Sequence, residues 1–161
     1  MNKRATVLIV EDSEDLRRLY AIALGLHGYR VIEARDGLEA LLLQEVDRPD
    51  LVILDLDLPK IPGHVVRDEL AAGALTREIP VVVVTGSADA TAEDLDVPCL
   101  LRKPVTPYRL LAAVQQCLAS GRSGVEPGRL RARRFGPHQG DTAADWTARS
   151  PRRRRTDFPN E

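Results

Sequence analysis

The chain has 161 residues, of which 43% are hydrophobic, enough for one domain of ordinary size and an extension. No apolar run approaches the ~18 residues of a membrane span, and acidic residues end the first run too early for a secretory signal. We therefore expect a soluble, cytoplasmic protein. The two cysteines, Cys99 and Cys117, are expected to be buried free thiols, since a single pair does not indicate a disulfide scaffold or a metal cluster.

The first third of the chain predicts three strands and two helices. Gly28 is a typical residue to follow the end of a helix, and Asp36 with Glu39 three residues later is typical of a helix N-cap. Pro49 closes that second helix. In chain order the predicted elements are a strand over residues 5–10, a helix up to residue 27, a strand over 29–34, a helix over 37–47 and a strand over 51–54.

The next part continues the alternation of strands and helices without any internal sequence repeat. Pro59 and the Pro62-Gly63 pair predict a loop, and Thr106 before Pro107 predicts the start of the last helix. The predicted elements are a helix over residues 64–72, a strand over 81–84, a short polar helix over 90–95, a strand over 99–101 and a helix over 107–119. The whole order amounts to five βα units, which predicts a parallel α/β sheet.

The composition changes near residue 121. Residues 1–121 carry 13 Lys and Arg against 19 Asp and Glu, a balance of −6, whereas residues 122–161 carry 10 Arg against 5 acids, a balance of +5. Gly, Pro, Ser and Arg dominate the second segment, which includes Arg152, Arg153, Arg154 and Arg155. Such a segment buries too little apolar surface to offset chain entropy, so we expect a folded domain over 1–121 and a disordered tail over 122–161.

Polar residues stand where four of the predicted strands end. Glu11 and Asp12 follow the first strand, Asp55 the third, Thr85 the fourth and Lys103 the fifth. Ligands of open parallel sheets bind outside the carboxyl ends of the strands, so these five side chains are expected to converge at one edge. Three acids, a hydroxyl and an amine in one place can hold a divalent cation and a phosphoryl group.

With these residues in place, residues 4–120 resemble a response-regulator receiver domain. The resemblance implies a flavodoxin-like (βα)5 fold with strand order 2-1-3-4-5. It also implies a phosphoacceptor, Asp55, a Mg²⁺ site and a set of residues that engage the phosphoryl group. The implied ligands of Mg²⁺ are Glu11, Asp12, Asp55 and the backbone carbonyl of Asp57, and the implied phosphoryl-binding residues are Thr85 and Lys103, with Gly86 leaving space beside them.

The chemistry of these residues agrees with the resemblance. A carboxylate that attacks a phosphoryl group faces charge repulsion, which Mg²⁺ and Lys103 can neutralise. Asp55 would then carry an acyl phosphate, and Thr85 can donate a hydrogen bond to the new dianion. The implied donor is a sensor histidine kinase or a histidine phosphotransfer protein, and the implied output is contact with a downstream protein. No enzymatic activity is expected beyond Mg²⁺-assisted self-phosphorylation and self-dephosphorylation.

Two features depart from the usual pattern of the family. An aromatic residue usually stands three positions before the lysine and couples to the threonine, and here that position holds Leu100. The segment between Thr85 and Lys103 is also shorter than usual, with room for about two helical turns. Both departures lie in the region that normally forms the output face, so the choice of partner or the dimerisation is expected to differ from that of typical members.

Three alternative interpretations remain open from the sequence. Asp55-Leu56-Asp57 also resembles the nucleophile motif of haloacid-dehalogenase-type phosphatases, although that family carries a further acidic pair after the lysine and residues 104–121 contain no acid. The arginines at 152–155 suggest a receiver whose tail binds nucleic acid phosphates. The third alternative is a receiver that no longer signals by phosphorylation.

Overall fold

A computed structural model describes residues 4–122, which form a five-stranded parallel sheet in the order β2-β1-β3-β4-β5. This order confirms the fold class predicted from the sequence. The strands are β1 (Thr6–Val10), β2 (Arg30–Ala34), β3 (Leu51–Asp55), β4 (Val81–Thr85) and β5 (Cys99–Arg102). The helices are α1 (Glu14–Leu26), α2 (Gly37–Asp47), α3 (Gly63–Ala72) and α4 (Pro107–Arg122).

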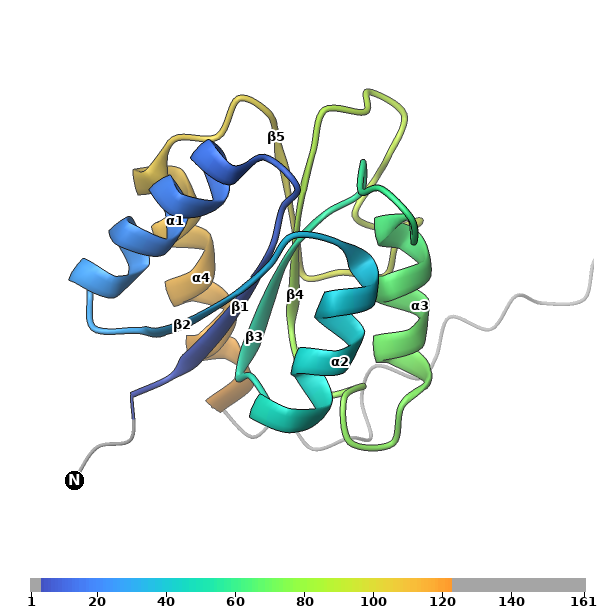
Figure 1. Cartoon of the computed structure of the whole chain (residues 1–161), viewed down its shortest axis with the longest axis horizontal. Helices are drawn as coiled ribbons and strands as arrows, with labels where there is room; N and C mark the ends of the chain where they lie inside the picture. Colours follow the sequence, from blue (N-terminus) through green and yellow to red (C-terminus); the bar gives the residue numbers. More distant parts are fainter. Residues whose placement is uncertain (1–3, 123–161) are drawn as a thin grey trace, which may run out of the picture. The chain divides into compact units, whose positions relative to one another are not determined.

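Helices cover both faces of the sheet, as Figure 1 shows, with α1 and α4 on one face and α2 and α3 on the other. Every residue of β1, β3 and β4 is buried, as expected of central strands between two helical layers. Alternate residues of each strand therefore enter two separate cores. Leu24, Leu110 and Val114 pack in the core under α1 and α4, and Val66 and Leu70 pack in the core under α2 and α3.

The capping signals in the sequence mark the observed helix ends. Asp36 accepts a hydrogen bond from the amide of Glu39 at 2.9 Å and caps α2, as predicted. His27 caps the C-terminus of α1, and Gly28 follows with a φ of 85°, a conformation that glycine adopts without strain. Ser13 caps the N-terminus of α1 through its side chain. Local polar chemistry therefore sets the ends of these helices.

The short polar helix predicted over residues 90–95 is wrong. The described residues between β4 and β5 form turns, and Asp96 has a φ of 47°, which ends any helical path. The Thr91 hydroxyl accepts a hydrogen bond from the amide of Asp94 at 3.1 Å and the Thr91 carbonyl accepts one from the amide of Leu95 at 3.2 Å, so only a single capped turn forms before Asp96. A segment this short also cannot offset the cost of helix nucleation. The described chain thus has five strands but four helices.

The last helix is longer than predicted. It ends at Arg122 and not near residue 119, so it crosses the composition change at residue 121. The predicted disordered tail and its four consecutive arginines, Arg152 to Arg155, lie outside the described residues apart from Arg122. The predicted division of the chain at residue 121 remains a prediction.

Two glycines allow the loop between β3 and α3 to pack closely. A Cβ atom at Gly63 would lie 2.1 Å from the carbonyl oxygen of Asp55, and one at Gly37 would lie 2.6 Å from the carbonyl oxygen of Ile61. Neither backbone atom can move aside without shifting a strand end or a helix start. The two glycines therefore fix residues 56–62 against the end of β3 and the start of α2.

An ion pair reinforces the same packing. The Nζ atom of Lys60 donates to Oδ2 of Asp36 at 2.6 Å, while Oδ1 of Asp36 caps α2. Lys60 has a φ of 66°, a strained value for a residue with a side chain. The Asp36 side chain is buried, and the hydrogen bond from Lys60 is the main reason that its pKa lies below the usual value. Asp36 thus joins the loops that follow β2 and β3.

The Gly63 contact predicts opposite effects for two glycine substitutions. Gly63→Ala is expected to lower the free energy of unfolding by about 1–3 kcal/mol, because its methyl group would overlap the Asp55 carbonyl. Gly25→Ala is the matched control within α1, since a Cβ there meets nothing within 4 Å. This control should raise stability by about 0.5–1 kcal/mol through its better helix propensity. Urea denaturation of both variants measures the difference, and a neutral Gly63→Ala would contradict the close approach.

The Asp36–Lys60 pair predicts a stability difference that depends on pH. The folded pKa of Asp36 is lowered, so ionised Asp36 stabilises the fold above its unfolded pKa of about 3.9, and this contribution is lost as pH falls through the folded value. Asp36→Asn should reduce stability by about 1 kcal/mol at pH 7 and by progressively less below about pH 4. Glu78→Gln, in an exposed pair with Arg77, is the control and should have little effect.

Candidate functional site

The polar residues at the strand ends are held in place by the sheet itself. Asp55 and Thr85 are the last residues of β3 and β4. The residues that follow β1 and β5 still make ladder hydrogen bonds, because the amide of Glu11 donates to the carbonyl of Ala34 at 3.1 Å and the amide of Lys103 donates to that of Thr85 at 2.9 Å. The backbone beneath the site is therefore as rigid as the sheet.

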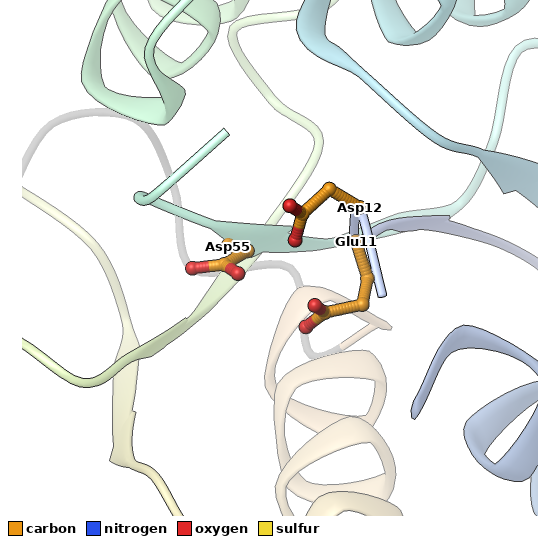
Figure 2. Close-up of side chains that lie close together, drawn as sticks. All are labelled: Glu11, Asp12 and Asp55. Atoms are coloured by element: carbon orange, nitrogen blue, oxygen red, sulfur yellow. The ribbon is translucent and has the colours of Figure 1, made fainter. Parts of the chain in front are cut away.

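Three carboxylates meet at this edge of the sheet. Glu11, Asp12 and Asp55 each place an oxygen within 4.8 Å of the other two, and Figure 2 shows their carboxyl groups facing a common space from the ends of β1 and β3. Glu11 and Asp55 are both 2% exposed, whereas Asp12 is exposed. The convergence of these three acids, predicted from their positions after apolar runs, is confirmed.

The ammonium group of Lys103 lies between the two buried acids. Its Nζ atom is 2.6 Å from Oδ2 of Asp55 and 3.0 Å from Oε2 of Glu11. Burying a carboxylate without a partner is strongly unfavourable, so this single cation makes the burial of both acids possible. Asp12 is left without this partner and adds a further negative charge at the surface.

Burial and pairing shift the ionisation of this group in predictable directions. Burial raises the pKa of Glu11, and the nearby charge of Asp55 raises it further, against the lowering effect of Lys103. Burial acts to lower the pKa of Lys103, but hydrogen bonds to Asp55 and Glu11 outweigh it and raise that pKa above the usual value. Lys103 therefore stays charged at neutral pH and can neutralise negative oxygen atoms.

Backbone groups orient the acids. The amide of Asp57 donates to Oδ1 of Asp55 at 3.0 Å, and the amide of Ser13 donates to Oε1 of Glu11 at 3.2 Å. Arg17 donates to the carbonyl oxygen of Glu11 at 2.8 Å, a role that the sequence analysis missed. The sequence did contain an indication of this contact, because an arginine one turn into α1 lies on the side of the helix nearest the acidic pair.

The threonine, glycine and leucine of the predicted site have different surroundings. Thr85 is fully buried, and its Oγ1 accepts a hydrogen bond from the amide of Ser87 at 3.0 Å. A Cβ atom at Gly86 would meet only Oδ2 of Asp57, at 3.9 Å, so the space there is open. Leu100 is partly buried against the core under α2 and α3.

A tyrosine that was not predicted from the sequence supports the loop after Lys103. Tyr20 of α1 is buried, and its hydroxyl donates to the carbonyl of Val105 at 3.2 Å. Burial and the charge of Glu11 raise the pKa of this phenol, so it remains a donor. The feature of the sequence that could have indicated this hydrogen bond is a tyrosine on the otherwise aliphatic inner face of α1. This bond links α1 to the segment that carries Lys103.

The donor set suits a hard divalent cation. Three carboxylates face one ammonium group, which leaves excess negative charge among oxygen ligands of the kind that Mg²⁺ prefers. Asp12 in particular is exposed and has no cation partner among the described residues. The residues present therefore fit a Mg²⁺ ion.

Comparison with known proteins agrees with the fold and the position of the site. Residues 7–115 match the family model of the response regulator receiver domain, and the chain belongs to that family. The receiver interpretation is thereby confirmed over the phosphatase alternative. Receiver domains are signalling modules of two-component systems.

Relatives of the chain include both longer regulators and short ones. It is 33% identical over 122 residues to the "Probable transcriptional regulator ycf27" of Cyanophora paradoxa, covering 73% of this chain and 49% of that protein. The chain thus spans about half the length of this relative. It is also 33% identical over 117 residues to the "Polar-differentiation response regulator DivK" of Brucella anthropi, covering 70% of this chain and 95% of that protein.

Solved structures show the same fold. The chemotaxis response regulator CheY4 of Vibrio cholerae superposes with a TM-score of 0.66 at 27% identity, covering 71% of this chain and 99% of that one. A response regulator structure from Chloroflexus aurantiacus gives a TM-score of 0.68 at 30% identity, covering 73% of this chain and 99% of the other. Among residues 4–122, no helix is long and apolar enough to cross a membrane.

The acidic cluster predicts a metal-dependent gain in stability. Mg²⁺ at ten times its dissociation constant should raise the free energy of unfolding by about 1.4 kcal/mol, because it binds only the folded arrangement of acids. Asp12→Ala should abolish this gain, and Asp15→Ala, an exposed acid of α1 outside the cluster, should retain it. Thermal unfolding with and without Mg²⁺ measures the gain, and an unchanged response in Asp12→Ala would remove the site.

Proposed function

We propose that this chain is a phosphorylation-dependent switch in which Asp55 accepts a phosphoryl group from a histidine kinase or a histidine phosphotransfer protein. The observation that carries the proposal is the environment of Asp55. Its Oδ2 is bound by Lys103 at 2.6 Å and its Oδ1 by the amide of Asp57 at 3.0 Å, beside two further carboxylates. This carboxylate is fixed in orientation, paired with an ammonium group and placed at the carboxyl end of β3.

The transfer step follows from this geometry. An oxygen of Asp55 forms a bond to phosphorus while the phosphorus–nitrogen bond of a phosphohistidine breaks, and the imidazole nitrogen leaves with the electron pair of that bond. Glu11, Asp12, Asp55 and the backbone carbonyl of Asp57 would hold Mg²⁺, which when bound neutralises charge on the phosphoryl oxygens. Lys103 is already 2.6 Å from Asp55, so its ammonium can pair with a phosphoryl oxygen after a small shift.

Thr85 and Gly86 take part after the transfer. Thr85 uses its oxygen as an acceptor for Ser87, which leaves the hydroxyl hydrogen available to a phosphoryl oxygen. The open space at Gly86 gives that loop room to approach. The same geometry supports slow return of the phosphoryl group to water, which makes the protein a timed switch. No other enzymatic activity is proposed.

The output is proposed to be contact with another protein. The name of the ycf27 relatives refers to transcription, but this chain spans about half of their length, so that role is not transferred to it. Nucleic-acid binding through Arg152 to Arg155 remains the alternative output, and those residues lie outside the described part of the chain. A cytoplasmic location fits both outputs and stays a prediction.

The nucleophile assignment predicts a single labile phosphoryl group. With Mg²⁺ and acetyl phosphate, the protein should gain one phosphoryl group that hydroxylamine removes, as expected of an acyl phosphate. Asp55→Asn should gain none. Asp57→Asn is the matched control, since only its backbone is assigned a role and the substitution leaves that backbone in place. Intact-protein mass spectrometry decides, and a stable label in Asp55→Asn, or one that resists hydroxylamine, would contradict the assignment.

A further inference from the structure

The loop over residues 86–98, which replaces the predicted helix, is held to the sheet by two side chains from neighbouring strands. Oγ1 of Thr85 accepts the amide hydrogen of Ser87, and the guanidinium of Arg102 donates to the carbonyl oxygen of Ala90. In Figure 1 this segment runs as a loop between β4 and β5. Residues 86–90 are therefore attached to the sheet at two points, Ser87 and Ala90.

The two anchoring side chains lie next to each other on the sheet. Thr85 and Arg102 are register partners on β4 and β5, so their side chains leave the same face of the sheet. Val83 and Leu100 are the next partners along the same face, and both pack in the core under α2 and α3. Arg102 thus occupies the face where an aromatic partner for the threonine would act, one alternate position closer to Lys103.

Arg102 has an unused hydrogen-bond donor. Its Nη2 binds the Ala90 carbonyl, but its Nη1 is buried and has no hydrogen-bond partner among the described residues. A buried donor without an acceptor is unfavourable, so it favours any loop arrangement that brings a second carbonyl within reach. Leu100 has no polar atom and cannot make such an exchange.

We propose that Arg102 transmits the phosphorylation state of Asp55 to the loop over residues 86–98. This inference rests on the proposed phosphorylation of Asp55. A phosphoryl dianion on Asp55 attracts the Thr85 hydroxyl and moves the amide of Ser87 with it. Arg102 holds the carbonyl of Ala90, so the displacement passes along residues 87–90 into residues 91–97, and Nη1 supplies the donor for the new position. Arg102 is a positioning residue, since it acts through the loop.

The test is hydrogen exchange of the full chain with Mg²⁺, with and without beryllium fluoride as the phosphoryl mimic. In the native protein, exchange should change in peptides from residues 86–89 and 91–97. In Arg102→Met, which keeps the aliphatic stem and loses every donor, the change at 86–89 should remain and that at 91–97 should fall at least threefold. Arg102→Lys, with its charge and a donor to Ala90, should recover part of it. Arg77→Met, in an exposed pair with Glu78, should behave as the native protein does.

The outcomes separate the inference from the function on which it rests. A native protein that shows no change at residues 86–89 contradicts the proposed function. If exchange changes at 86–89 in the native protein and the change at 91–97 is not reduced in Arg102→Met, the role of Arg102 is overturned and the proposed function is not. Faster exchange at 91–97 in Arg102→Met by the same factor in both states also overturns it, since Arg102 would then only fasten the loop. Melting temperatures of the variants verify that each comparison is between folded proteins.

Discussion

The structure depends on one ammonium group that serves two buried carboxylates. Lys103 lies 3.0 Å from Glu11 and 2.6 Å from Asp55, and without it the ends of β1 and β3 could not carry buried acids side by side. The supporting contacts surround this arrangement. The amide of Lys103 continues the ladder from β4, and Tyr20 holds the segment just beyond it. Buried acids held by one ammonium group at the end of a rigid sheet suit the proposed role of Asp55, which is to gain and lose a dianion.

Sequence patterns were sufficient for the sheet and for the acids at its edge. Short β-branched runs predict strands, and the end of each run predicts where its polar residue emerges, so Glu11, Asp12 and Asp55 could be brought together without coordinates. The helix cap at Asp36 could also be predicted from the sequence, because its hydrogen bond joins residues only three positions apart. These predictions rest on periodicity and on neighbours within four residues, which a sequence displays directly.

Contacts between distant segments could not be predicted in the same way. Nothing local pairs Lys60 with Asp36, Tyr20 with Val105 or Arg102 with Ala90, since each pair depends on how two loops or layers meet. The polar helix expected over residues 90–95 failed for a related reason. Its composition allowed helical turns, but the loop there is fixed by hydrogen bonds to the sheet and by the Thr91 side chain. The least predictable region is therefore the loop between β4 and β5, where the helix expected from the sequence does not form.

The position of Lys103 late in the chain has a consequence for biosynthesis. A nascent chain that has emerged only as far as β4 contains all three carboxylates of the cluster and lacks their ammonium partner. Burying Glu11 and Asp55 at that stage would leave two carboxylates without a cation, which is strongly unfavourable. Only when β5 leaves the ribosome, and α4 follows to cover it, does the counter-charge arrive. The order of synthesis therefore withholds the paired arrangement of Lys103 and Asp55, on which the proposed phosphoryl transfer depends, until β5 has been made.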